Sequence, residues 1–368
     1  MKKLLLPLSV AAFAALTGCG ADSDSDSNKN DTTESTSSDY TSISGVDASA
    51  GYAYFDLETG AVVSLTADQA ATDTTWDIAF NGTSIILNGG YSGSADVKAY
   101  FTGNNADFFD GEGNAIADQF TAATPESELA DFTAVTSADI PASSEFDTDT
   151  FLTRFGSDFY AYNPTDHSIG ENADQSYLVS QDDGVYQVRV TELSNLDAQN
   201  QPGRSITEMT LGVSFKGAND SAFGDEQLVV LPECTDDAYV DLSAYNVVSE
   251  SDSWDLNVKC SAFEIQLGDN VTAYALQDGD DALTFAGYAS NEYARYYFLA
   301  DGAETFFKDK AKWYQYNLEG GHKIWSQYGV YLVQNSTATY KLQITSYYGV
   351  ASDSTVTSKQ YSFIYQAL

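Results

Sequence analysis

The sequence predicts an all-β protein of two tandem antiparallel domains with a few short helices, and three observations support this. The 368 residues include 25 Tyr and 20 Phe but only 2 Met, a composition that leans towards β structure. Several segments alternate apolar and polar residues between turn-forming residues. Motifs of the first half also recur in the second half in the same order. Length alone leaves two domains or one large domain open.

The expected strands are short segments that alternate with period two and end at turns. The clearest are residues 84–87 before Asn88-Gly89-Gly90, residues 186–190 after Asp182-Asp183-Gly184, and residues 361–365 near the C-terminus. Helical periodicity is faint and is confined to residues 125–132 and 302–313. This pattern predicts antiparallel sheets with minor helical content.

The repeat consists of two blocks with matching internal spacing. In the first block, Tyr54-Phe55-Asp56-Leu57, Val62-Val63 and Trp76-Asp77 recur as Tyr239-Val240-Asp241-Leu242, Val247-Val248 and Trp254-Asp255. In the second block, Tyr162-Asn163 precedes Tyr177-Leu178-Val179 by the interval at which Tyr316-Asn317 precedes Tyr331-Leu332-Val333. We therefore expect one domain at residues 46–225 and a second at 226–368, with a boundary near residues 217–232. Chance similarity between β-rich segments is the alternative.

The charge balance excludes several classes of partner. The chain has 16 Lys and Arg against 54 Asp and Glu, a formal net charge of -38 at pH 7. Phosphate backbones and anionic lipid surfaces are both bound through Lys and Arg. We therefore expect neither nucleic acid nor a polybasic membrane contact.

The N-terminus resembles that of a bacterial lipoprotein. Lys2-Lys3 precedes an apolar run at residues 4–16, which is too short for a stable membrane span, and Leu16-Thr17-Gly18-Cys19 resembles a lipobox. This predicts a signal peptide at residues 1–18, lipidation of Cys19 and an otherwise soluble protein held by its lipid. Gly20 rather than Asp after the cysteine favours the outer membrane, at the cell surface or on the periplasmic face. A plain secretory signal is the alternative.

Residues 19–45 are expected to form the lipidated cysteine and a disordered tether. Beyond Cys19, this segment is rich in Ser, Asp, Thr and Asn and has almost nothing to bury, so it cannot offset the entropy of ordering. Asp22, Asp24 and Asp26 imitate the start of a calcium loop, but Ser27 and Thr33 stand where that loop needs Gly and Glu.

The other two cysteines predict a disulfide. Cys234 and Cys260 form an even pair in an expected oxidising compartment and flank one strand and its return. Two buried thiols are the alternative. Neither cysteine has the neighbours of a nucleophile or a zinc ligand. The sequence also lacks the usual nucleophile-elbow, zinc-protease, P-loop and dinucleotide motifs, so we expect no enzyme.

The ordered motifs resemble the HmuY family of haem-binding lipoproteins. The resemblance rests on Trp76-Asp77-Ile78-Ala79-Phe80, Asn88-Gly89-Gly90 and the aromatic segment Phe159-Tyr160-Ala161-Tyr162-Asn163, with Trp313-Tyr314-Gln315-Tyr316-Asn317 as its second copy. It implies an all-β surface protein that holds haem iron between two histidines. It also implies transfer of haem to a TonB-dependent outer-membrane receptor.

The candidate haem ligands are His167 and His322, the only histidines of the chain, one in each repeat. One histidine per repeat precludes a bis-histidine site within one domain. Iron could instead be held by one histidine, by a Tyr phenolate or by one histidine from each domain. The alternative for both is a loop-end histidine that donates hydrogen bonds to the strand below. Candidate partners for the haem propionates are Lys98, Arg189, Arg295 and Lys323.

Two function classes follow. The first is a surface-anchored, haemophore-like lipoprotein that sequesters haem and passes it to a receptor. The second is a lipoprotein that kept the β fold but binds a protein or a glycan; a cavity without inward His, Met or Tyr would favour it. A calcium-stabilised adhesion module is a third possibility.

Overall fold

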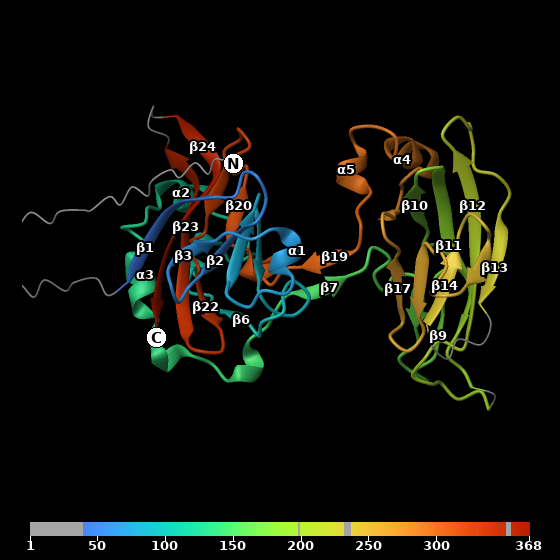
Figure 1. Cartoon of the computed structure of the whole chain (residues 1–368), viewed down its shortest axis with the longest axis horizontal. Helices are drawn as coiled ribbons and strands as arrows, with labels where there is room; N and C mark the ends of the chain where they lie inside the picture. The colour runs from blue at the N-terminus through green and yellow to red at the C-terminus, as the bar shows by residue number, and fades with distance from the viewer. Residues whose placement is uncertain (1–39, 198, 232–236, 351–354) are drawn as a thin grey trace, which may run out of the picture. The chain divides into compact units, whose positions relative to one another are not determined.

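The computed structural model describes residues 40–197, 199–231, 237–350 and 355–368 (Figure 1). The expected signal peptide, the lipidated Cys19 and most of the expected tether lie outside the described residues. Among the helices within those ranges, none combines the length and the apolar composition needed to cross a bilayer.

The all-β prediction is confirmed. Every strand pair of the described residues is antiparallel. The α-helices are short: α1 (Ala67–Ala70), α2 (Ala117–Ala122), α3 (Leu129–Ala134), α4 (Ala282–Tyr288) and α5 (Ala294–Tyr297). Four 3-10 turns accompany them: η1 (Ala106–Phe108), η2 (Ser137–Asp139), η3 (Ser143–Glu145) and η4 (Asp309–Ala311).

Only one of the two expected helical segments contains an α-helix. Residues 125–132 overlap α3, whereas residues 302–313 begin with strand β19 (Gly302–Glu304) and hold only the turn η4. Strand β19 pairs with β7 (Thr150–Leu152). Its backbone groups are therefore satisfied by a neighbouring strand that local periodicity cannot reveal.

Two sheets and their core form what we call lobe 1, residues 40–149 and 305–368. One sheet has the order β1 (Thr41–Asp47), β24 (Val356–Ala367), β23 (Thr339–Val350), β22 (Val330–Gln334) and β6 (Lys98–Phe101). The other has the order β3 (Ala61–Val63), β2 (Ala53–Asp56), β4 (Ile78–Asn81) and β5 (Ser84–Leu87). Phe55, Phe80, Trp313, Tyr361 and Phe363 are buried in its main core cluster.

Two further sheets form lobe 2, residues 153–301. The first has the order β13 (Gln227–Leu231), β12 (Glu208–Gly217), β11 (Gly184–Ser194), β10 (Tyr177–Gln181) and β18 (Thr272–Ala275). The second has the order β15 (Asn246–Val248), β14 (Asp237–Asp241), β16 (Leu256–Lys259) and β17 (Glu264–Leu267). Tyr177, Val188, Leu211 and Val240 belong to its core.

Each lobe also carries one small β-hairpin. In lobe 1, β20 (Tyr314–Tyr316) pairs with β21 (Ile324–Ser326). In lobe 2, β8 (Tyr160–Tyr162) pairs with β9 (Ile169–Glu171).

The strand pairing corrects the expected division of the chain at residue 225. Ala99 of β6 lies opposite Val333 of β22, so residues near both ends of the chain share one sheet. Val179 of β10 lies opposite Ala273 of β18, across the expected boundary. The ranges 46–225 and 226–368 are therefore not separate folding units in this structure. The two copies carry similar motifs at the same spacing, so the sequence does not show which strand pairs with which.

The expected tether ends earlier than residue 45. Thr41–Asp47 is strand β1, in which Ile43 lies opposite Phe363 and Val46 is buried. The Tyr40 ring also packs against Phe132, with ring centroids 5.7 Å apart. These few apolar side chains are too widely spaced to stand out in a Ser/Thr-rich segment, but the β24 edge supplies their partners.

The Trp-Asp motif serves the same structural purpose in both lobes. The Asp77 carboxylate accepts a hydrogen bond from the Leu57 backbone N–H at 2.7 Å, and Asp255 accepts one from the Leu242 N–H at 2.7 Å. The adjacent tryptophans contact the matching tyrosines, with centroids 5.0 Å apart for Tyr54–Trp76 and 5.2 Å for Tyr239–Trp254. The motif therefore secures the turn after a strand.

Buried carboxylates predict a gain of stability in mild acid. Burial raises the pKa of Asp77 and of Asp149, although hydrogen bonds to both oppose the rise. The folded state therefore binds these protons more tightly than the unfolded state does. The resulting stabilisation is complete below the unfolded pKa of about 4 and is lost as the pH rises through the folded pKa.

We therefore expect the free energy of unfolding to be larger at pH 5 than at pH 7, as measured by urea titration. Asp149→Asn should reduce this difference, because a tenfold difference in proton affinity between the two states is worth about 1.4 kcal/mol. Loss of charge repulsion acts in the same direction, so the comparison with the variant isolates the carboxylate. An unchanged pH dependence in Asp149→Asn would refute this explanation.

The expected disulfide stays a prediction, because Cys234 lies outside the described residues. Cys260 is fully buried at the end of β16. If the two cysteines are joined, reduction of the unlipidated protein should lower the free energy of unfolding by about 3 kcal/mol. Peptide mapping without reductant, followed by urea titration with and without reductant, measures both points. Recovery of two alkylated cysteines from the unreduced protein would contradict the bond.

Candidate functional site

The hairpin of β20 and β21 presents two chemically active side chains at its turn. Tyr316 is the last residue of β20, and His322 lies two residues before β21. His322 has a φ of 57° and donates its backbone N–H to Asn317 Oδ1 at 2.9 Å. Gly320 and Gly321 also have positive φ, which glycine adopts without strain. The glycines thus allow the chain to turn the histidine back towards the strand.

Tyr316 and His322 form a close polar pair. The Tyr316 hydroxyl lies 2.5 Å from His322 Nδ1. The phenol can donate to an unprotonated Nδ1, in which case the ring proton is on Nε2. Alternatively, Nδ1–H donates to the phenol oxygen and leaves Nε2 with a free lone pair. In the second form Nε2 is a nitrogen ligand that Tyr316 orients. The Tyr316 oxygen could serve instead as a phenolate ligand that accepts from Nδ1–H.

The hairpin of β8 and β9 repeats this arrangement in lobe 2. The Tyr162 hydroxyl lies 2.5 Å from His167 Nδ1, and His167 has a φ of 62°. Both side chains are exposed. Asn195 Nδ2 donates to the His167 carbonyl and so ties the turn to β11. The two predicted ligands therefore lie in different lobes, each paired with a tyrosine of its own hairpin.

The Tyr316–His322 pair lies beside a cavity of about 890 Å³, a volume within the range of small-molecule sites. Its aromatic lining comes from α2, from the β20–β21 hairpin, from the connection between β21 and β22 and from β23: Phe120, Tyr316, Trp325, Tyr328, Tyr347 and Tyr348. His322 and Lys323 also line it, and none of the lining residues in the described part of the chain is acidic. Because the chain is strongly acidic overall, a wall without carboxylates is suited to an anionic aromatic ligand.

The electrostatics of the wall separate neutral aromatic groups from possible ligand contacts. Burial raises the pKa of Tyr328 to about 12, with a further contribution from the charges of Glu128 and Glu126, and burial also raises that of Tyr347. These two phenols therefore stay protonated at neutral pH. The indole N–H of Trp325 is buried and, within the described ranges, has no hydrogen-bond acceptor. A buried donor left unpaired is costly unless a ligand satisfies it.

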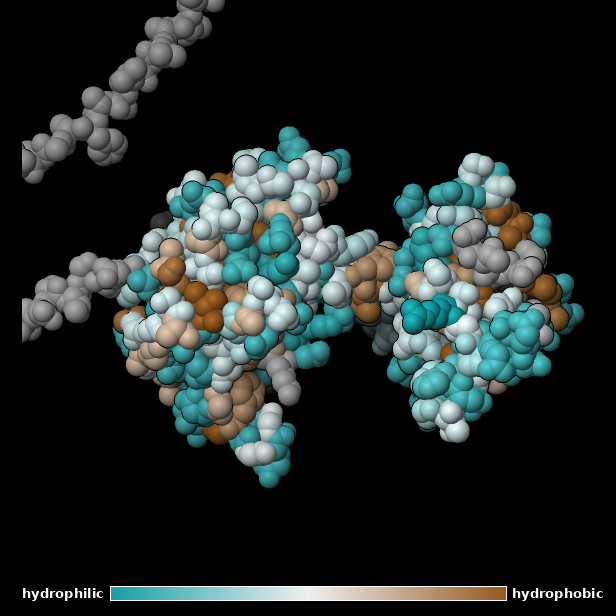
Figure 2. Space-filling model, turned by 90° about the horizontal axis from the view of Figure 1, so that it is seen from below, coloured by the Kyte–Doolittle hydropathy of each residue, from teal (hydrophilic) through white to brown (hydrophobic). Residues whose placement is uncertain are grey.

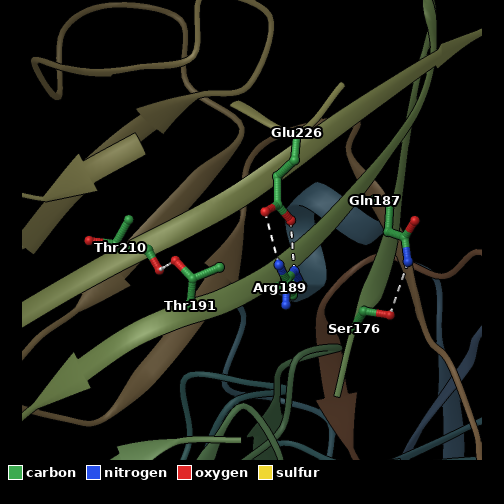
Figure 3. A network of polar contacts seen from close by, with 6 residues as sticks. All are labelled: Ser176, Gln187, Arg189, Thr191, Thr210 and Glu226. Atoms are coloured by element: carbon green, nitrogen blue, oxygen red, sulfur yellow. Dashed lines mark hydrogen bonds and ion pairs between the residues drawn. The ribbon is translucent and has the colours of Figure 1, made fainter. Parts of the chain in front are cut away.

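Of the four cations considered for haem propionates, Lys323 is the one that lines this cavity. Its Nζ lies 5.5 Å from the centre of the Trp325 ring. Arg189 instead forms a two-point ion pair with Glu226, at 2.7 and 2.9 Å (Figure 3). Lys98 pairs with Asp96 at 3.0 Å, and Arg295 lies over the Tyr296 ring. Lys323 is therefore the best-placed partner for a carboxylate.

These residues fit a haem group better than a hydrated metal ion. The described residues contain no cluster of three or more His, Cys, Asp or Glu side chains that could hold an ion. The cavity offers flat aromatic walls, one oxygen–nitrogen pair and one ammonium group. That combination matches a planar apolar ring system with a metal at its centre and carboxylates at its edge.

Sequence reasoning found the two histidines but missed most of the site. The recurrence of Tyr316 and His322 as Tyr162 and His167, at spacings of six and five residues, is the signal that could have revealed the pairs. Phe120 and Thr83 are separated from Tyr316 by about half the chain, and strand pairing alone brings them to the cavity.

Hydropathy at the surface does not itself mark the site. Figure 2 shows apolar residues as scattered patches among hydrophilic ones on the face in view. A family model described as HmuY protein matches residues 48–214. A search of curated proteins found no significant match.

Proposed function

This chain belongs to the HmuY family through residues 48–214, and on that premise we propose that it is a haem-binding, haemophore-like lipoprotein. The proposal includes an anchor at Cys19, a place at the outer membrane facing the cell exterior, and transfer of haem to a TonB-dependent receptor. Family membership supports the binding of haem. The lipobox at residues 16–19 supports the anchor.

The proposed haem site is the cavity beside Tyr316 and His322. The observation that carries it is the short Tyr316–His322 contact at the edge of a cavity whose described lining is aromatic and without carboxylates. His322 Nε2 or the Tyr316 oxygen would hold the iron, and the other residue would orient that ligand through the contact at Nδ1. Bound haem would supply the iron centre.

Other residues of the cavity position the ring and its edge. Phe120, Tyr328 and Tyr347 form apolar walls that exclude water from the ring faces. Lys323 would supply the positive charge for a propionate. The lining His and Tyr side chains favour this function over a protein- or glycan-binding module, for which a cavity without such groups was the expectation.

Titration of haemin into the unlipidated protein tests the function. We expect a sharpened, red-shifted Soret band that saturates at one haem per chain. The single site follows from the pairing of one hairpin with a cavity of ligand size. The absence of any spectral change with both oxidised and reduced haem would refute the function.

A further inference from the structure

Two aspartates occupy matching positions at the ends of the segments that join the lobes. Asp149 Oδ2 accepts a hydrogen bond from the Leu87 N–H, at the end of β5, at 2.9 Å. Asp301 Oδ2 accepts one from the Leu267 N–H, at the end of β17, at 2.6 Å. Each carboxylate therefore secures the last strand of the four-stranded sheet that precedes it in the chain.

The second oxygen of each carboxylate binds the opposite segment. Asp149 Oδ1 accepts from the Phe306 N–H at 2.8 Å, and Asp301 Oδ1 accepts from the Arg154 N–H at 2.7 Å. Phe306 is five residues after Asp301, and Arg154 is five residues after Asp149. Each aspartate therefore binds the chain segment that follows the other aspartate. Between these contacts, β7 and β19 run antiparallel to each other.

The strand pairs on the two sides of the β7–β19 ladder match in register. Val333 lies opposite Ala99 in lobe 1, as Val179 lies opposite Ala273 in lobe 2. Each lobe also has an aromatic pair in the matching position after this ladder. The ring centroids are 5.0 Å apart for Phe307–Tyr331 and 4.1 Å apart for Phe155–Tyr177.

The outer edges of the two large sheets match as well. Strand β1, which precedes the first four-stranded sheet in the chain, pairs with β24. Strand β13, which precedes the second one, pairs with β12. Both strands lie at the start of their half of the chain and pair with the end of the other half.

We propose that the chain is a duplication of one two-part domain whose parts have exchanged partners at Asp149 and Asp301. The first part of copy one (residues 40–149) pairs with the second part of copy two (residues 305–368) and forms lobe 1. The second part of copy one (residues 153–225) pairs with the first part of copy two (residues 226–301) and forms lobe 2. Sequential pairing would instead join the matching positions of one copy, with β6 beside β10 in place of β22. The β7–β19 ladder is made only in the exchanged form and selects it, as straight hinges do in swapped proteins.

The exchange also determines the composition of the cavity. Thr83 and Phe120 come from the first part of copy one, whereas Tyr316 and His322 come from the second part of copy two. Sequential pairing would place the Tyr316 hairpin against residues 237–301 instead. The exchange does not depend on what the cavity binds.

Engineered disulfides in the full unlipidated chain distinguish the two pairings. Lys98 lies opposite Gln334 and Ser180 lies opposite Thr272, and all four side chains are partly exposed. Lys98→Cys with Gln334→Cys reports the exchanged form, and Lys98→Cys with Ser180→Cys reports the sequential form. Both pairs are made in a background with Cys234→Ser and Cys260→Ser. Peptide mapping after oxidation identifies each bond.

We expect the exchanged-form pair to cross-link at least about tenfold more than the sequential-form pair. A flexible Gly/Ser insertion after Leu152 and another after Glu304 allow each segment to fold back. They should raise the sequential-form cross-link about tenfold while circular dichroism shows a folded protein. A sequential-form disulfide between two chains also supports the proposal, because it joins the same two parts of the domain.

Two results would overturn the proposal. If the sequential-form pair stays uncross-linked in the folded insertion variant, the parts are not interchangeable. If it dominates in the chain without insertions, the exchanged pairing is not native. Haemin titration of the same samples is read separately, so that failure of haem binding does not affect the conclusion on pairing.

Discussion

His322→Ala should weaken haemin binding by about a hundredfold or more, whereas His167→Ala should leave it nearly unchanged. Loss of an axial ligand, or of the residue that orients it, removes an interaction worth about 2–3 kcal/mol or more, and each 1.4 kcal/mol is tenfold in affinity. Both histidines are exposed, but His322 lines the cavity and His167 does not. Soret titration of the unlipidated variants measures the difference.

Tyr316→Phe separates the two ligand assignments. If the Tyr316 oxygen holds the iron, this variant should lose as much affinity as His322→Ala and should change the spin state seen by electron paramagnetic resonance. If His322 Nε2 holds the iron, the loss should be about tenfold, because only the orienting hydrogen bond at Nδ1 is removed. Tyr162→Phe is the matched control on the other hairpin. Equal losses at both hairpins would contradict the single-cavity site.

The strands of the fold could be predicted because their signals are local. In β11, the buried Tyr186, Val188 and Val190 alternate with the half-buried Gln187 and Arg189. Pairing across the chain could not be predicted in the same way. The segments containing Tyr177-Leu178-Val179 and Tyr331-Leu332-Val333 are nearly interchangeable, so spacing shows that they correspond without showing which strand each one joins.

The site shows the same limit. His322 was identifiable because histidine is rare in this chain, and its chemistry suits iron. Its pairing with Tyr316 depends on a turn in which His322 itself has positive φ, a conformation that its residue type does not predict. Phe120 reaches the cavity only through the pairing of β6 with β22. Long-range pairing therefore determines what surrounds a ligand that local sequence can identify.

Trp313→Ala should lower the free energy of unfolding of lobe 1 by about 3–5 kcal/mol. The ring is 1% exposed and lies 5.3 Å from the Tyr361 ring, between centroids. Its indole N–H donates to the Thr83 carbonyl at 2.9 Å and so joins the two chain segments, residues 40–149 and 305–368, that make up lobe 1. Hydrogen exchange read by mass spectrometry should show lost protection in β4, β6 and β22–β24, and unchanged protection in β10–β12.

The control is Phe159→Ala, which removes the ring that occupies the corresponding position in lobe 2. Phe159 is also 1% exposed, and its ring lies 5.0 Å from Tyr160, as that of Trp313 lies 4.9 Å from Tyr314. This variant should reverse the pattern, with protection lost in β10–β12 and kept in β22–β24. If residues 226–368 formed one unit, Trp313→Ala would instead deprotect β14–β18 and leave β4 and β6 intact. The location of the lost protection therefore decides which strands share a core.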